Sequence, residues 1–228
     1  MNRTARRDFF ALVGALTLLL SVDVSPVGAP TISQAVTLNQ DYATKALGKL
    51  AVKGRAPKTG YSRSLFSDGW GSTNGCDTRN LILRRDLRSI TWRSDASCLV
   101  ATGILQDPYT GRTINFVRGV RTSLAVQIDH IVAVSDAWQK GAQQLSADSR
   151  YSFYNDPLNL LAVDGPTNEA KGDGDAATWL PPNKAFRCSY VSRQIAVKSK
   201  YKLWITSAEK DAMTRVLSSC PKQLLPIG

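Results

Sequence analysis

The chain has 228 residues, of which 43% are hydrophobic and 21% are charged, and its formal net charge is +11. This length is typical of one globular domain with its own core, and the composition excludes a chain that is disordered throughout. A cation surplus of this size favours a polyanionic partner, namely nucleic acid, anionic lipid or an acidic cell-wall polymer.

Residues 1–35 are predicted to be an export signal. A basic start with an Arg-Arg pair precedes a short apolar run from Phe9 to Leu20, and Ser33 to Ala35 is a small-x-small cleavage site. The Arg-Arg pair also resembles a twin-arginine signal. An uncleaved anchor is disfavoured because the apolar run is too short to span a bilayer. The mature protein is therefore expected to be secreted or associated with the cell wall, with no membrane attachment.

Residues 36–75 are predicted to form an N-terminal helix and a basic loop. Apolar residues recur at helical spacing from Leu38 to Leu50. The segment from Lys53 to Ser64 is polar and basic, and it either faces phosphate or is a solvated linker. Asp68 to Asn80 is rich in turn residues, and Leu81 to Leu87 is predicted to be helical.

The cysteines predict two disulfides, because an even number of them in an exported chain is typical of a disulfide framework. Of the three possible pairings, the local one is preferred because each pair brackets one contiguous segment. A zinc site is disfavoured because the chain contains no C-x-x-C spacing. The preferred pairs are Cys76 with Cys98 and Cys188 with Cys220.

A β-hairpin is predicted from Cys98 to Leu105 and from Arg112 to Arg118. The connection contains an Asp-Pro pair and a late glycine, which set the backbone angles that a turn needs. Arg118 and Arg121 are assigned to nucleic-acid contact, with an ordinary solvated strand face as the alternative.

The middle of the chain predicts a strand, an excursion, a second strand and a helix. Leu124 to Ile128 alternates in polarity and leads into Asp129 and His130, and Leu158 to Val163 is a short apolar strand. Pro166 then opens a helix, where proline is favoured in the first turn. The excursion, residues 133–154, reads as helix or long loop.

The C-terminal part predicts two helices. A Pro-Pro pair precedes a long basic helix over residues 183–202, which has an apolar side and a side that can lie along phosphates. Its last cations, Lys198, Lys200 and Lys202, are assigned to nucleic-acid binding. Thr206 and Glu209 form a capping box for a last helix.

The residues that carry chemistry lie between Asp129 and Lys171. His130 is the single histidine of the chain, and Asp129 precedes it, while Asn159 and Asn168 follow at a distance. A lone histidine is more often structural than catalytic. However, one imidazole beside a carboxylate, with an amide able to share a cation with that carboxylate, is a minimal hydrolytic site.

These residues resemble the HNH, or ββα-metal, endonuclease superfamily, in which a D-H pair, an N-L element and a late N-x-x-K-G element form one finger. More narrowly, DHIVAVSDAWQKGA and NDPLNLLAVDGPTNEAKGDGD look like secreted HNH proteins of actinobacteria, which are related to the C-terminal domain of GmrSD restriction endonucleases. The resemblance covers about Cys76 to Cys220. It implies an α+β fold for residues 76–228: a ββα-metal finger with a flanking β-hairpin and C-terminal helices.

The resemblance also implies a role for each motif residue. His130 would activate water, with its other ring nitrogen held by a backbone carbonyl, and Asn159 would tie the loop that carries His130 to the second strand. Lys171 would contact phosphate. Asp129 and Asn168 would hold one divalent ion, Mg²⁺ with Mn²⁺ as the alternative, because hard oxygen ligands suit these ions.

The implied function is an exported metal-dependent endonuclease that cuts DNA, with RNA as the alternative, at low sequence specificity. The alternatives are a non-catalytic binder of extracellular nucleic acid or another polyanion, and a secreted nuclease toxin. Two acids in the GDGD segment, Asp173 and Asp175, either hold a second cation or belong to an ordinary loop. The tryptophans Trp138, Trp179 and Trp204 are expected to pack in the core rather than stack on bases.

Overall fold

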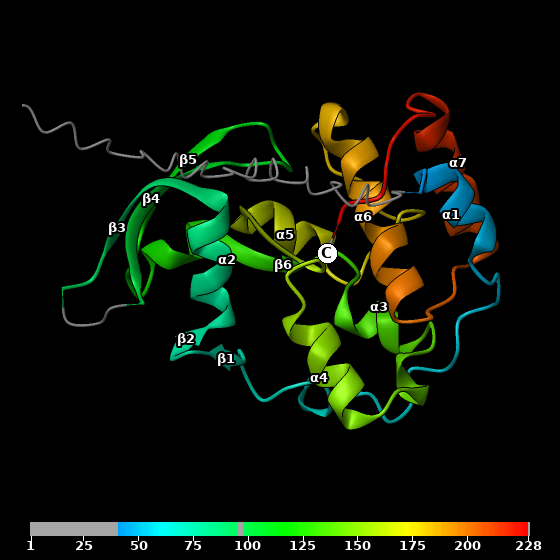
Figure 1. The fold of residues 1–228 in the computed structure, drawn as a ribbon, viewed down its shortest axis with the longest axis horizontal. Helices are drawn as coiled ribbons and strands as arrows, with labels where there is room; N and C mark the ends of the chain where they lie inside the picture. The colour runs from blue at the N-terminus through cyan, green and yellow to red at the C-terminus, as the bar shows by residue number, and fades with distance from the viewer. Residues whose placement is uncertain (1–40, 95–97, 228) are drawn as a thin grey trace, which may run out of the picture. The chain divides into compact units, whose positions relative to one another are not determined.

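The computed structural model describes residues 41–94 and 98–227. The predicted export signal over residues 1–35 lies outside the described residues. In the described part, no helix is long and apolar enough to cross a membrane. The helices and strands in this part make a mixed α+β fold, as predicted (Figure 1).

The centre of the described part is an antiparallel hairpin of β6 (Val126–His130) and β7 (Leu160–Asp164). The helix α5 (Gly165–Lys171) follows β7 directly and contacts both strands. It starts there because the Asp164 carboxylate accepts a hydrogen bond from Thr167 N and because a proline occupies the first turn. The predicted strand–excursion–strand–helix order is confirmed.

The excursion between β6 and β7 is mostly helical. It contains α3 (Val134–Trp138), a 3₁₀ turn η3 (Ala142–Gln144) and α4 (Ala147–Asn155). Ser146 caps α4 by accepting a hydrogen bond from Ser149 N. This excursion brings the end of α4 back beside His130.

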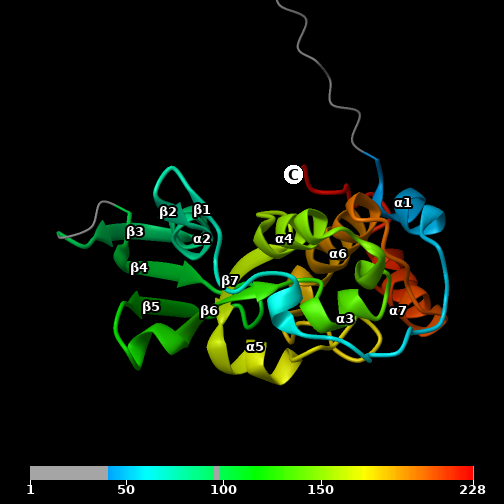
Figure 2. The same ribbon diagram turned by 90° about the horizontal axis from the view of Figure 1, so that it is seen from below.

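A three-stranded antiparallel sheet lies next to the hairpin in the order β3 (Leu87–Trp92), β4 (Val100–Gln106) and β5 (Thr113–Val117). The predicted β4–β5 hairpin is confirmed. The predicted helix over residues 81–87 is α2 (Thr78–Asp86), and β3, which follows it, was not predicted. Figure 2 shows α2 and β1–β5 on one side of the β6–β7 hairpin and the C-terminal helices on the other.

The C-terminal helices pack with the N-terminal segment. The helix α1 (Ala43–Lys49) contacts α6 (Arg187–Lys200) and α7 (Ser207–Ser218). The predicted basic helix begins with a 3₁₀ turn, η4 (Lys184–Phe186), and α7 starts at the predicted cap, where Thr206 accepts from the backbone N–H of Glu209. The remaining short elements are η1 (Arg63–Leu65), β1 (Ser72–Thr73), β2 (Cys76–Asp77) and η2 (Thr122–Ala125).

Apolar side chains from all these elements are buried against one another. One cluster joins α2 and the three-stranded sheet to β6 and β7, and two others join α1, α3, α4, α6 and α7. As expected, Trp138 and Trp204 are buried in the core, and Trp179 packs edge-on against Tyr109 with ring centroids 5.0 Å apart.

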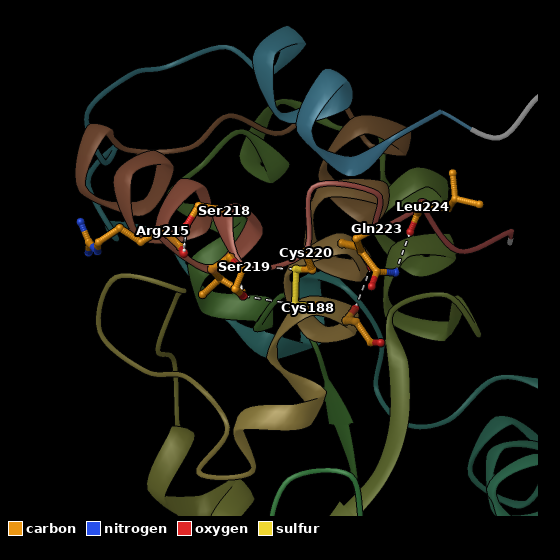
Figure 3. The surroundings of a disulfide bond; sticks show 10 residues. Cys188, Arg215, Ser218, Ser219, Cys220, Gln223 and Leu224 are labelled. Carbon is orange, nitrogen blue, oxygen red and sulfur yellow. Dashed lines mark hydrogen bonds between the residues drawn. A yellow bond between two sulfur atoms is a disulfide. The ribbon is translucent and has the colours of Figure 1, made fainter.

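Both predicted disulfides are present. Cys76 is bonded to Cys98 and Cys188 to Cys220, with Cα atoms 5.5 Å and 6.4 Å apart. The first joins β2 to Cys98, which lies just before β4. The second joins the first turn of α6 to Cys220, just after the end of α7 (Figure 3).

Candidate active site

Asp129 and His130 point to opposite faces of β6, because successive side chains alternate along a strand. Asp129 faces α5 and bonds to Lys171. His130 faces the other way, toward Trp70 and the end of α4. The D-H pair therefore places its carboxylate and its imidazole in two different environments.

The His130 ring is held in one tautomer. Its Nε2 lies 2.8 Å from the carbonyl oxygen of Tyr154, and a carbonyl only accepts, so Nε2 carries the hydrogen and Nδ1 carries the lone pair. Burial lowers the pKa of His130 to about 3, and the positive charge of Arg63 acts in the same direction. The imidazole is therefore neutral at physiological pH. Among the described residues, no group forms a hydrogen bond with Nδ1.

Two aromatic rings lie against this imidazole, and Arg63 contacts one of them. Trp70 stacks on the imidazole with ring centroids 5.7 Å apart and an interplanar angle of 8°, and the ring of Tyr154 lies 4.4 Å away. Arg63, on η1, donates from Nε to the Tyr154 hydroxyl at 3.2 Å and lies over the same ring. A pocket of about 640 Å³ runs along residues 64–70 past Trp70 to the start of α4. Only 4% of His130 is exposed beneath these groups.

Sequence reasoning gave no role to Trp70, Arg63 or Tyr154. Arg63 does lie in the basic segment that was interpreted as either a phosphate-facing flank or a linker. No spacing rule connects any of these three residues to His130, because they come from other elements and meet it only in the folded chain.

The Asp129 carboxylate is buried, and both of its oxygens accept a hydrogen bond. Oδ1 accepts from the Lys171 ammonium at 2.8 Å, and Oδ2 accepts from the Tyr109 hydroxyl. Burial raises the pKa of Asp129, while the charge of Lys171 opposes that shift. The Lys171 Nζ also donates to the His130 carbonyl at 2.8 Å. The structure thus corrects the role predicted for Lys171: an enclosed ammonium does not contact phosphate.

Asn168 faces the same side of β6 as Asp129 but has a different partner. Its Nδ2 donates to Gln127 Oε1 at 2.8 Å, and Gln127 lies on β6 two residues before Asp129. In the described residues, no group of three His, Cys, Asp or Glu side chains could hold a metal ion. Lys171 and Tyr109 each bond one Asp129 oxygen, so a metal ion shared by Asp129 and Asn168 would require the Lys171 ammonium to move away.

Asn159 contacts the backbone immediately after His130. Its Oδ1 accepts from Val132 N at 2.9 Å, and its own carbonyl accepts from Ile131 N at 2.8 Å. The side chain is fully buried. These are the contacts that a residue positioning the His130 loop would make.

Lys198 belongs to a buried cluster of charges, so its assignment to nucleic acid was wrong. Its ammonium donates to Glu209 at 2.6 Å and lies 3.5 Å from Asp136. Lys140, which is also buried, bonds Asp136, Glu209 and Asp175 at 2.8, 2.6 and 2.7 Å. The carboxylates that neutralise Lys198 come from α3 and α7, and α6 itself has no acid.

The acids of the GDGD segment are also paired. Burial opposes ionisation of Asp175, but the bond to Lys140 and the charge of Arg55 outweigh it and lower the Asp175 pKa to about 2. Asp173 is exposed and bonds Lys58 at 3.1 Å. Both acids therefore form ion pairs within the fold, as expected for an ordinary loop.

The other cations assigned to nucleic acid differ in exposure. Arg118 is half-buried and donates to the Val100 carbonyl at 2.6 Å and to Asn80 at 2.5 Å, so it ties β4 to α2 rather than facing a ligand. Lys200 is half-exposed and pairs with Asp156 at 2.7 Å. Arg121 and Lys202 are exposed, and neither forms an ion pair with a described residue.

Comparison with known proteins links this chain to a family and to a relative. The family model described as the C-terminal domain of GmrSD restriction endonucleases matches residues 77–216. A protein of Arthroderma benhamiae, described as an uncharacterized secreted protein, is 38% identical over 215 residues, which cover 93% of this chain and 98% of that protein. The secreted relative and the two disulfides confirm the predicted location: the protein is secreted.

Proposed function

The chain belongs to the family of GmrSD restriction endonuclease C-terminal domains, and we propose that it is an exported nuclease that hydrolyses the phosphodiester bonds of nucleic acid. The observation that carries this proposal is the state of His130. Its tautomer is set by the Tyr154 carbonyl, so Nδ1 keeps the lone pair that a general base needs. Burial holds the pKa of His130 below the range of an effective base, so water and the phosphate charge must come beside the ring before it takes a proton.

In this mechanism, Nδ1 of His130 accepts a proton from the water that attacks phosphorus. The positive charge that then develops on the ring is balanced by the negative charge of the phosphate group. Water and phosphate must reach Nδ1, so the proposal includes a shift of Trp70 on substrate binding. Asn159 holds the backbone after His130 and so keeps the ring against the Tyr154 carbonyl.

Arg63 is proposed to supply the phosphate contact that the resemblance assigned to Lys171. It is exposed, and in the described part of the chain no carboxylate pairs with it. Tyr154 positions both groups, since its carbonyl accepts from His130 and its hydroxyl accepts from Arg63. A guanidinium in this place suits a phosphate group because it presents several N–H donors in one plane.

Dependence on Mg²⁺, or alternatively Mn²⁺, is a further proposal, and it comes from the family resemblance alone. A divalent ion held by Asp129 and Asn168 would stabilise negative charge on the phosphate group. In the structure Lys171 bonds Asp129 Oδ1 and Gln127 accepts from Asn168 Nδ2, so no step above is routed through the ion.

The substrate is proposed to be DNA, with RNA as the alternative, bound at low sequence specificity. Exposed cations such as Arg121 and Lys202 contact phosphates rather than base edges, so binding should weaken steeply with salt. A non-catalytic nucleic-acid binder is the second candidate. The observation that favours it is the cover over His130, where Trp70 and Tyr154 leave the imidazole almost no exposed surface.

The test is incubation of plasmid DNA and labelled RNA with Mg²⁺, Mn²⁺, Zn²⁺ or EDTA. His130→Ala should bind DNA as the wild type does but cleave it about 10²–10⁴ times more slowly. Lys45→Ala is the control, because Lys45 is exposed and paired with Asp41 on α1. Equal cleavage by His130→Ala and wild type would overturn the general-base assignment. Binding without cleavage in every metal arm would instead favour the binder.

Arg63→Gln tests the phosphate contact separately. It should raise KM and lower kcat, and Arg63→Lys should recover part of both, because the lysine keeps the charge but loses the planar donor pattern. Unchanged kinetics in Arg63→Gln would show that Arg63 does not contact the phosphate.

A further inference from the structure

A pocket of about 540 Å³ lies between residues 176–180, the first turn of α6 and the last turns of α7. Its lining includes three cationic side chains and two hydroxyl groups, and no carboxylate lines it. These polar residues are Thr178, Lys184, Arg187, Arg215 and Ser219.

The three cations come from three separate elements. Lys184 lies on η4, Arg187 on α6 and Arg215 on α7. Among the described residues, no Asp or Glu forms an ion pair with any of them, and Arg187 uses its Nε to donate to the Pro181 carbonyl at 2.8 Å. This differs from Lys140 and Lys198, whose charges are neutralised inside the fold. The pocket therefore concentrates uncompensated positive charge.

The Cys188–Cys220 disulfide holds two of these elements together. Cys188 lines the pocket, and its partner lies just after the end of α7. Figure 3 shows Arg215 one turn before the disulfide, with its side chain directed away from the sulfur atoms. A covalent link between the basic segments lowers the entropy lost when both contact one anion.

We propose that this pocket is a second phosphate-binding site, which holds the backbone of the nucleic-acid strand away from the point of cleavage. This inference rests on the proposed function, from which it takes nucleic acid as the ligand. Trp179 lines the pocket and packs on Tyr109, whose hydroxyl bonds Asp129, so the pocket adjoins the hairpin on the face of Asp129. His130 lies on the opposite face, which makes this site distinct from the proposed cleavage site.

The test measures binding, not cleavage, so that it can fail independently of the proposed nuclease activity. All proteins carry His130→Ala, and binding of a short fluorescein-labelled single-stranded DNA is followed by anisotropy without divalent ions. The double variant Lys184→Ala/Arg215→Ala is compared with Lys45→Ala/Lys49→Ala, which removes the same charge from α1, where both lysines pair with Asp41.

The expected loss follows from counterion release. With a slope of about −0.7 per phosphate on a single strand, each lost contact should weaken binding roughly eightfold at about 0.05 M salt and roughly twofold at about 0.3 M. The pocket variant should therefore flatten the plot of log K against log salt by about 1.4, whereas the α1 control should leave the slope nearly unchanged. Equal slopes for the two variants would overturn the proposal.

Inorganic pyrophosphate provides the second arm. It should displace DNA from the His130→Ala protein but not from the variant that also carries Lys184→Ala and Arg215→Ala. Equal competition in both proteins would place the phosphate site elsewhere and overturn the inference. Lys184→Ala and Arg215→Ala are also measured singly, each with about half the effect on slope, so that a folding defect of the double variant leaves the comparison intact.

Discussion

Lys171→Met is the sharpest test of the arrangement around Asp129. Methionine keeps the apolar length of the lysine and removes its ammonium. Asp129 would then be a buried carboxylate with only the Tyr109 hydroxyl as donor, and the His130 carbonyl would lose its Lys171 partner. Removing one member of a buried ion pair costs about 3–5 kcal/mol, because the remaining charge stays buried without compensation.

The assay is urea unfolding at pH 7 with the disulfides intact, followed by tryptophan fluorescence. For a domain of this size, the same loss of about 3–5 kcal/mol would lower the Tm in thermal unfolding by roughly 6–20 °C. Lys200→Met is the matched control, since Lys200 is half-exposed and its partner Asp156 also accepts from the Tyr201 hydroxyl. The control should lose about 1 kcal/mol or less.

The same variant tests the metal proposal. If a divalent ion binds at Asp129, loss of the Lys171 ammonium frees one of the two ligand oxygens, so Mn²⁺ should stabilise Lys171→Met more than the wild type. A loss of less than about 1 kcal/mol in Lys171→Met would refute the buried pair. Lys171 would then be available to phosphate, and Asp129 to a metal, as the family resemblance implies.

Two further predictions concern His130 and the second disulfide. Because the chain has one histidine, its imidazole signals in ¹⁵N NMR can be assigned without ambiguity. These signals should show the Nε2–H tautomer, and the ring should not titrate between about pH 8 and pH 5. The pKa of His130 is about 6.5 in the unfolded chain and about 3 in the folded chain, so below pH 6.5 the unfolded chain binds a proton that the folded chain does not. The free energy of unfolding should therefore fall as the pH drops, by about 2 kcal/mol at pH 5. An imidazole signal that titrates near pH 6.5 in the folded protein would contradict the burial of His130. Cys188→Ser/Cys220→Ser should lower the free energy of unfolding in urea by about 3–4 kcal/mol, because the disulfide closes a loop with a sequence separation of 32. Little or no change in the free energy of unfolding would show that this disulfide does not constrain the unfolded chain.

Much of the backbone was predictable because local chemistry determines it. Alternating polarity predicted β6, the Asp-Pro turn predicted the β4–β5 hairpin, and proline in the first turn predicted α5. The strand β3 was missed because Leu87 follows a helical pattern directly, and the strand exists through its pairing with β4.

The disulfides were predictable from the even cysteine number and the sequence distance between partners. The residues at the centre of the candidate site were also recognisable, because the D-H pair and the later asparagines occur at the spacing of a known family. Asn159, for example, contacts the backbone beside His130, where the resemblance places it.

The role of each charge, in contrast, depends on how distant segments pack in the folded chain. The sequence presents Lys171 and Lys198 as cations like Arg63 or Lys184. The fold encloses the first two with carboxylates from distant elements, Asp129 for Lys171 and Glu209 for Lys198. Arg63 and Lys184 meet no such carboxylate in the described residues and stay exposed. A cation binds an external phosphate only where the fold leaves its charge uncompensated and accessible, and that depends on which distant segments pack around it.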